Sequence, residues 1–111
     1  GQPGPREGFE LAYGQQITIP EEGLTLAFKE VNEDSRCPSG VQCIWAGQAT
    51  ITLNFSKSGS PSESRVVTIP GSNTTSYLNY NISFLKLAPY PSIGHQPSPA
   101  EYVATLVVRK Q

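Results

Sequence analysis

The feature that most constrains the fold is a short loop between two cysteines that leads directly into a strand pattern. Cys37 and Cys43 enclose residues 38–42, PSGVQ, a spacing that a turn can close with acceptable disulfide geometry. Residues 43–56 then alternate between apolar and polar side chains, with the only tryptophan, Trp45, on the apolar face. Such alternation is typical of a strand with one buried and one wet face. We therefore expect an exported β protein with a Cys37–Cys43 disulfide.

Two other states of the cysteines are considered. Free thiols would fit a cytosolic protein, and a metal site would need two more ligands although His95 is the only histidine. Closing so short a ring stabilises the fold by roughly 2 kcal/mol in the chain-entropy model. The main role of the disulfide should therefore be to fix the shape of the loop.

Length and charge narrow the class of protein. A chain of 111 residues suits one domain, which we place at residues 9–111. The net charge of −1, with 15% charged residues, is too weak a field to attract nucleic acid. No apolar run approaches the roughly 18 residues of a membrane span. Residues 1–8 are expected to form a linker or N-terminal arm, as would follow a cleaved leader or an upstream lipid anchor.

Period-two patterns predict about seven short strands. Leu24, Leu26 and Phe28 form an inward row. In the alternating pattern before them, from residue 9 to residue 19, Gly14 interrupts the alternation, which predicts one bent strand or two short ones. Further strands are expected at residues 43–56, 65–69, 77–87 with a change of phase at Leu85 and Leu87, and 102–108 in a central position. Their spacing and the Gly/Pro-rich turns predict a single antiparallel β-sandwich of immunoglobulin-like character.

Several of these residues also carry a resemblance to a protein family. The run Asp34-Ser35-Arg36-Cys37-Pro38, then Gly40-Val41, Cys43, Trp45-Ala46-Gly47 and Ala49, resembles a family of small bacterial secreted proteins and lipoproteins without an assigned function. Pro89-Tyr90-Pro91, followed by Tyr102 and Leu106, is similar to the C-terminal half of that family. The resemblance implies export, a β fold and a disulfide, and it transfers no catalytic residue.

The acidic residues before the cysteine loop superficially suggest a calcium site. An EF-hand is excluded because Ser35 stands where that loop needs Gly, and Val41 where it needs Glu. A looser site built by Glu30, Glu33 and Asp34 stays open, although such carboxylates commonly solvate a turn. We prefer a structural role, in which Asp34 caps the turn and Arg36 pairs with a neighbouring carboxylate.

No catalytic centre is recognisable. A Ser–His–acid hydrolase would have to use His95, which lies in a Pro-rich connection, and the chain has no Gly-x-Ser-x-Gly elbow. We expect neither an enzyme nor a bound cofactor. Three sequons begin at Asn54, Asn73 and Asn81. By strand alternation, or by position in a loop, all three would be accessible to glycosylation.

Two function classes follow from these observations. The first is a non-enzymatic structural or interaction domain at the cell surface or in the periplasm, which contacts copies of itself or another surface protein. It would use residues 1–8 and the strand with Phe9, Leu11 and Tyr13 to add a strand to a neighbour, as in a filament. The same strand can instead complete the sheet of its own chain.

The second class is a monomeric ligand-binding or inhibitory domain. It would use the Cys37–Cys43 loop together with Tyr77 and Tyr90 as a contact surface, because rigid loops on a sandwich are common recognition devices and Tyr offers contact area at low entropic cost. Alternatively Tyr90 plugs the end of the sandwich, which is a common fate of a large aromatic side chain.

Overall fold

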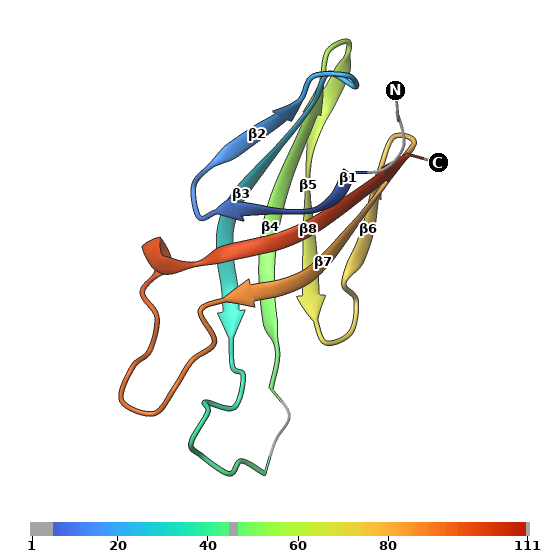
Figure 1. The fold of residues 1–111 in the computed structure, drawn as a ribbon. Coiled ribbons are helices and arrows are strands. Elements are labelled where there is room, and N and C mark those ends of the chain that lie inside the picture. Colours follow the sequence, from blue (N-terminus) through green and yellow to red (C-terminus); the bar gives the residue numbers. More distant parts are fainter. Residues whose placement is uncertain (1–5, 45–46, 111) are drawn as a thin grey trace.

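The described part of the chain folds into eight antiparallel strands and one short 3₁₀ helix (Figure 1). The computed structural model describes residues 6–44 and 47–110. The elements are β1 Arg6–Ala12, β2 Gln16–Ile19, β3 Leu24–Asp34, β4 Ala49–Lys57, β5 Ser60–Ile69, β6 Thr74–Tyr77, β7 Tyr80–Ala88, η1 Pro99–Glu101 and β8 Val103–Lys110.

The strands form two sheets of four, in the orders β1-β8-β7-β6 and β2-β3-β4-β5. This confirms the predicted all-β sandwich. The sequence left the strand order open, and the structure shows two meanders, in which every neighbouring pair except β1 and β8 is consecutive along the chain. The architecture is the two-sheet sandwich that immunoglobulin domains also have, with a strand order of its own.

The N-terminal pattern forms two strands in different sheets. Gly14 sits between them with a φ of +79°, a conformation that favours glycine. Its amide donates to Phe28 O at 2.9 Å, so the corner is attached to β3. β1 pairs with β8 of its own chain, Phe9 opposite Leu106 and Leu11 opposite Ala104. The N-terminal strand therefore completes the sheet of its own molecule.

The predicted inward rows form the core. Leu24, Leu26 and Phe28 of β3 are fully buried, and the apolar row of β4 is buried with them. The predicted change of phase in β7 is a β-bulge between Phe84 and Lys86, after which Leu85 is half exposed and Leu87 is buried. β8 lies between β1 and β7, as expected of a central strand.

Several predicted boundaries were wrong. Strand β4 begins at Ala49, not at residue 43, and Trp45 lies outside the described residues. β5 begins at Ser60, not at residue 65, because the turn before it is tight. The expected strand over residues 77–87 is interrupted by a turn at Leu78. The described residues therefore form eight strands, where about seven were expected. Part of the expected N-terminal arm, from Arg6 onward, belongs to β1.

A polar contact joins the two sheets at the end where β7 begins. The Tyr80 hydroxyl, in a residue that is 1% exposed, donates to Glu22 Oε1 at 2.9 Å. Lys57 Nζ lies 2.5 Å from the same hydroxyl oxygen, and Lys110 Nζ lies 3.2 Å from Glu22 Oε1. Hydrogen bonds from Tyr80 and Lys110 lower the pKa of Glu22.

Tyr77 belongs to the core, contrary to its expected place in a contact surface. It is 1% exposed, its ring stacks on Phe55 at a centroid distance of 5.5 Å, and its hydroxyl donates to Pro61 O at 2.8 Å. Its position follows from the turn after β6, which leaves the last residue of that strand pointing inward.

The substitution Tyr77→Ala should lower the free energy of unfolding by about 3–5 kcal/mol, because it removes a large buried aromatic side chain. Tyr77→Phe keeps the ring and should cost about 1 kcal/mol for the lost hydrogen bond. Urea denaturation followed by circular dichroism measures both. Equal, small losses in the two variants would contradict the placement of Tyr77 in the core.

Candidate functional site

An ion pair lies at the end of the sandwich where β3 leaves its sheet. Arg36 Nε donates to Asp34 Oδ1 at 2.7 Å and Arg36 Nη2 donates to Asp34 Oδ2 at 2.8 Å, a bidentate pair. The two side chains are 8% and 5% exposed. The Tyr102 hydroxyl donates to Asp34 Oδ2 at 2.6 Å. The predicted pairing of Arg36 with a neighbouring carboxylate is confirmed, and its partner is Asp34.

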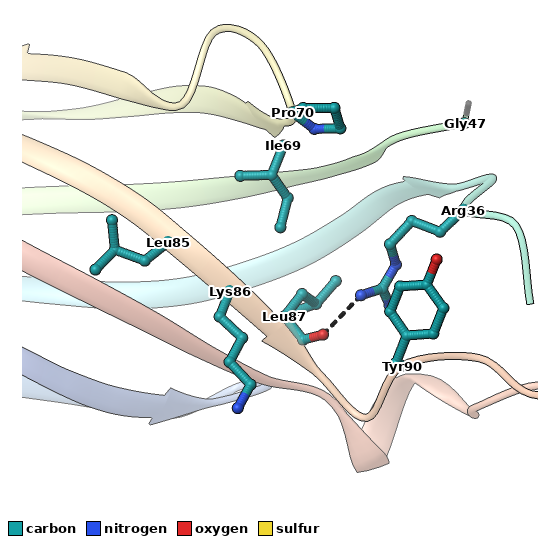
Figure 2. Close-up of a pocket in the computed structure, with 8 residues that line it drawn as sticks. All are labelled: Arg36, Gly47, Ile69, Pro70, Leu85, Lys86, Leu87 and Tyr90. Atoms are coloured by element: carbon teal, nitrogen blue, oxygen red, sulfur yellow. Dashed lines mark hydrogen bonds between the residues drawn. The ribbon is translucent and has the colours of Figure 1, made fainter. Parts of the chain in front are cut away.

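Arg36 also binds the opposite sheet. Its Nη1 donates to Leu87 O at 2.7 Å and its Nη2 donates to Pro89 O at 3.3 Å, so one guanidinium connects the end of β3 to the end of β7 (Figure 2). The guanidinium carbon lies 4.9 Å from the centroid of the Tyr90 ring, a cation–π distance. The Tyr90 hydroxyl donates to Cys37 O at 2.7 Å and thereby reaches the disulfide loop.

The electrostatics of this network favour its ionised state. Burial alone would raise the pKa of Asp34, but hydrogen bonds from Arg36 and Tyr102 and the charge of Arg36 hold it below the ordinary value of 3.8. Burial and the hydrogen bond to Asp34 raise the pKa of Tyr102 to about 12. The tyrosine is therefore a neutral donor at physiological pH.

The two sides of the disulfide loop are held together where they meet the sheet. Ser35 N donates to Gln48 O at 2.8 Å and Gln48 N donates to Ser35 Oγ at 3.1 Å. Gly47 has a φ of +73°, and a Cβ placed there would lie 2.1 Å from Ser35 O. Only glycine allows this close approach, so the backbone conformation at the base of the loop is restricted.

The disulfide loop and the Pro-rich loop pack against each other. The predicted Cys37–Cys43 disulfide is formed, with the Cα atoms 5.9 Å apart. Ser39 N donates to Pro91 O at 3.0 Å, and Ile93 N donates to Ser39 O at 3.1 Å. We call residues 37–44 and 89–98 together the loop end; Figure 1 shows both loops extending from the same end of the sandwich.

The loop end exposes apolar side chains and carries little charge. Ile44 is 100% exposed, Ile93 69%, Tyr90 53% and Val41 42%. Residues 37–48 and 89–100 contain no Asp, Glu, Lys or Arg. Uncharged loops with exposed apolar groups are suited to contact another apolar surface.

A groove of about 450 Å³ adjoins the loop end. It lies between the end of β5 and the second half of β7, and Arg36 and Tyr90 stand at one side of it (Figure 2). Leu85 and Leu87 contribute from β7, and Ile69 and Pro70 contribute from the end of β5. The groove is therefore mainly apolar and of the size of a binding site for a large side chain.

The structure brings together only some of the residues that the sequence suggested for an interaction surface. Tyr90 lies at the surface beside the disulfide loop, as expected. Leu11 is fully buried, and Phe9 and Tyr13 are half-buried against the core, so these side chains face their own molecule. Val41, Ile44 and Ile93 were missed; their only sequence signal is their position in charge-free loops.

The carboxylates of the suggested calcium site have other partners. Both oxygens of Asp34 bind Arg36, and Glu33 accepts hydrogen bonds from Ser35 and Gln48. Glu30 is exposed on β3. No group of three or more metal-binding side chains occurs within the described ranges. His95 lies at the surface, as expected, with Nε2 3.0 Å from Glu101 Oε1.

The sequons differ in their surroundings. Asn54 is half-buried on β4 and its Oδ1 accepts a hydrogen bond from Ser64. Asn73 lies in a loop, and its Nδ2 donates to Phe84 O at 3.1 Å. Asn81 is half-buried on β7. The amide of Asn73 therefore has a structural role, and glycosylation of all three stays a prediction.

Comparisons with known proteins returned no matching family model, no matching curated protein and no matching solved structure. In the part of the chain that the structure describes, no helix has the length and apolar character needed to cross a membrane. The geometry of the loop end is therefore the basis for inferring a function.

The substitution Arg36→Ala should lower the free energy of unfolding by about 3–5 kcal/mol, because it leaves the Asp34 carboxylate buried without its counter-ion. Arg65→Ala is the matched control, since Arg65 pairs with Glu63 at the surface and such pairs contribute about 0–1 kcal/mol. Urea denaturation measures both variants. A loss for Arg36→Ala as small as that for Arg65→Ala would contradict the structural importance of the pair.

The stability of the fold should decrease at both extremes of pH. The pKa of Asp34 is lower in the folded state, so its contribution is present above about pH 4 and is lost as the pH falls toward the folded pKa. Tyr102 has a raised pKa of about 12, so its contribution is present below about pH 10 and is lost as the pH rises toward the folded value.

Urea midpoints measured between pH 2 and 12 test this, with Asp34→Asn and Tyr102→Phe as references. Asp34→Asn should flatten part of the acid limb, and Tyr102→Phe should flatten part of the alkaline limb. Glu22 also has a lowered pKa, so some acid dependence should remain. Acid and alkaline limbs unchanged by these substitutions would contradict the assignment.

Proposed function

We propose that this chain is a non-enzymatic exported interaction domain, which contacts a partner protein with the loop end. The observation that carries the proposal is the combination of exposed Ile44 and Ile93 with loops that are closed by a disulfide and joined by main-chain hydrogen bonds. Apolar groups held in place before binding lose little conformational entropy when a partner covers them.

The composition of the loop end supports a protein partner. The cores of protein interfaces are depleted in charged residues and enriched in aromatic ones, and the loop end has Tyr90 exposed beside Ile93 without an Asp, Glu, Lys or Arg in either loop. Arg36 holds Tyr90 from one side of its ring. The hydroxyl of Tyr90 is bound to Cys37 O, which leaves the ring itself for contact.

The positions of β1 and the loop end also favour a partner protein over a membrane to which a lipid anchor would attach the chain. β1 begins near the end of β8, whereas the loop end lies past the opposite end of the sheets (Figure 1). A chain attached through its N-terminus, as in a lipoprotein, would present the loop end away from the attachment point. The longest dimension of the molecule is 46 Å.

Export agrees with the disulfide. A Cys37–Cys43 bridge is consistent with an oxidising extracellular or periplasmic location. We propose a secreted or surface-bound bacterial protein, in line with the resemblance of the residues around Cys37 to secreted proteins and lipoproteins.

Self-assembly through the N-terminal strand is less well supported by the geometry. β1 already pairs along β8, and Gln15 binds both main-chain groups of Ala12. Native mass spectrometry of the full chain should therefore give a monomer. Large assemblies at micromolar concentration would favour the filament-like alternative over the loop end.

The double substitution Ile44→Ser/Ile93→Ser tests the proposal. Immobilised wild-type protein should retain a partner from a cell-surface extract of the source organism, and the double variant should lose it, with retained proteins quantified by mass spectrometry. Val66→Ser is the control, because Val66 is 57% exposed on β5, away from the loop end. Both variants should keep the wild-type unfolding midpoint, since these side chains are exposed.

Retention of the same proteins by the wild type and the double variant would contradict the proposal. A loss in the Val66→Ser control as large as in the double variant would do so as well, because the contact would then depend on exposed apolar groups in general.

A further inference from the structure

The groove beside the loop end is open because strand β6 covers only half of its neighbour. β6 pairs with β7 from Tyr80 to Ser83, and Asn73 binds the main chain of Phe84. Beyond Phe84 no described strand lies along this edge of β7. The free edge and the end of β5 form the two walls of the groove.

The β-bulge shapes the wall that β7 contributes. A regular strand would turn Leu85 and Lys86 to opposite faces, but the bulge leaves both exposed, and both line the groove. Leu85 is 52% exposed. Bulges commonly re-aim side chains next to functional sites.

Two cationic side chains, Arg36 and Lys86, line the groove, and they differ in their ion pairing. Arg36 is neutralised by Asp34 and donates to the main-chain carbonyls of Leu87 and Pro89, which also blocks pairing of another strand with those carbonyls. Lys86 has no ion pair among the described residues. Figure 2 shows its side chain leading away from Ile69 and Pro70.

We propose that this groove binds one bulky apolar side chain of the partner protein, with a carboxylate of the partner beside Lys86. The apolar walls from Ile69, Leu85 and Leu87 match the side chain. The Lys86 ammonium group, which has no ion pair among the described residues, matches a single negative charge outside the groove. The inference rests on the proposed interaction function, and it names the chemistry of the segment that the partner contributes.

N-acetylphenylalanine is a minimal probe of this chemistry, and its amide, N-acetylphenylalaninamide, lacks the charge. In ¹³C-methyl NMR titrations of the full chain, both should shift the methyl signals of Ile69, Leu85 and Leu87. The acid should bind about two- to five-fold more tightly than the amide, the effect of one exposed ion pair. N-acetyllysinamide, which repels Lys86, should cause no saturable shift.

Paired substitutions locate the two halves of the site. Lys86→Gln should abolish the preference for the acid, whereas Lys29→Gln, at an exposed position of β3, should leave it unchanged. Leu85→Ser should weaken both probes, whereas Val66→Ser should weaken neither. Ile44→Ser/Ile93→Ser should leave both titrations unchanged, so a failure at the groove is distinguishable from a failure at the loop end.

Three results would overturn the inference. The first is the absence of saturable shifts at Ile69, Leu85 and Leu87 up to 50 mM N-acetylphenylalanine. The second is equal affinity for acid and amide in the wild type. The third is tight binding of sodium decanoate without binding of N-acetylphenylalanine, which would assign the groove to a lipid chain instead of a protein side chain.

Discussion

The buried ion pair between Asp34 and Arg36 is the interaction on which the rest of this structure depends. Among the described residues, only the Arg36 side chain binds the end of β3, the end of β7 and the ring of Tyr90 at the same time. Taking both charges out of water is costly, and the cost is offset because Tyr102 and two main-chain carbonyls complete their hydrogen bonds. The loops beyond it therefore begin from fixed positions.

The edges of the sheets explain why the loops, not the strands, are the better candidates for contact. Side chains occupy single main-chain carbonyls on β5, β6 and β7: Tyr77 binds Pro61 O, Arg65 binds Ser76 O, and Arg36 binds Leu87 O. Such capping is a common means of preventing edge-to-edge pairing. The same sequence leaves Ile44 and Ile93 uncovered at the loop end, where burial would require a second molecule.

Local patterns predicted much of the fold and only part of the candidate site. Alternation identified the inward rows of β3 and β4 and the change of phase at Leu85, because these depend on period two alone. Alternation did not reveal that Tyr77 ends a strand and faces the core, because the turn that follows places Leu78 at a φ of +55°, which is uncommon for a residue other than glycine. The position of Tyr102 beside Asp34 was likewise hidden, since the two residues meet only after both sheets form.

The proposed function requires that the loop end is rigid before any partner binds. The most direct test is ¹⁵N relaxation of the unbound protein, read at the amides of residues 37–44 and 89–98. We predict order parameters near 0.85, equal to those of β3 and β4, because the disulfide, the Ser39 hydrogen bonds and Arg36 hold both loops. Order parameters below about 0.6 in these loops would show that the loop end is flexible and would contradict the proposed function.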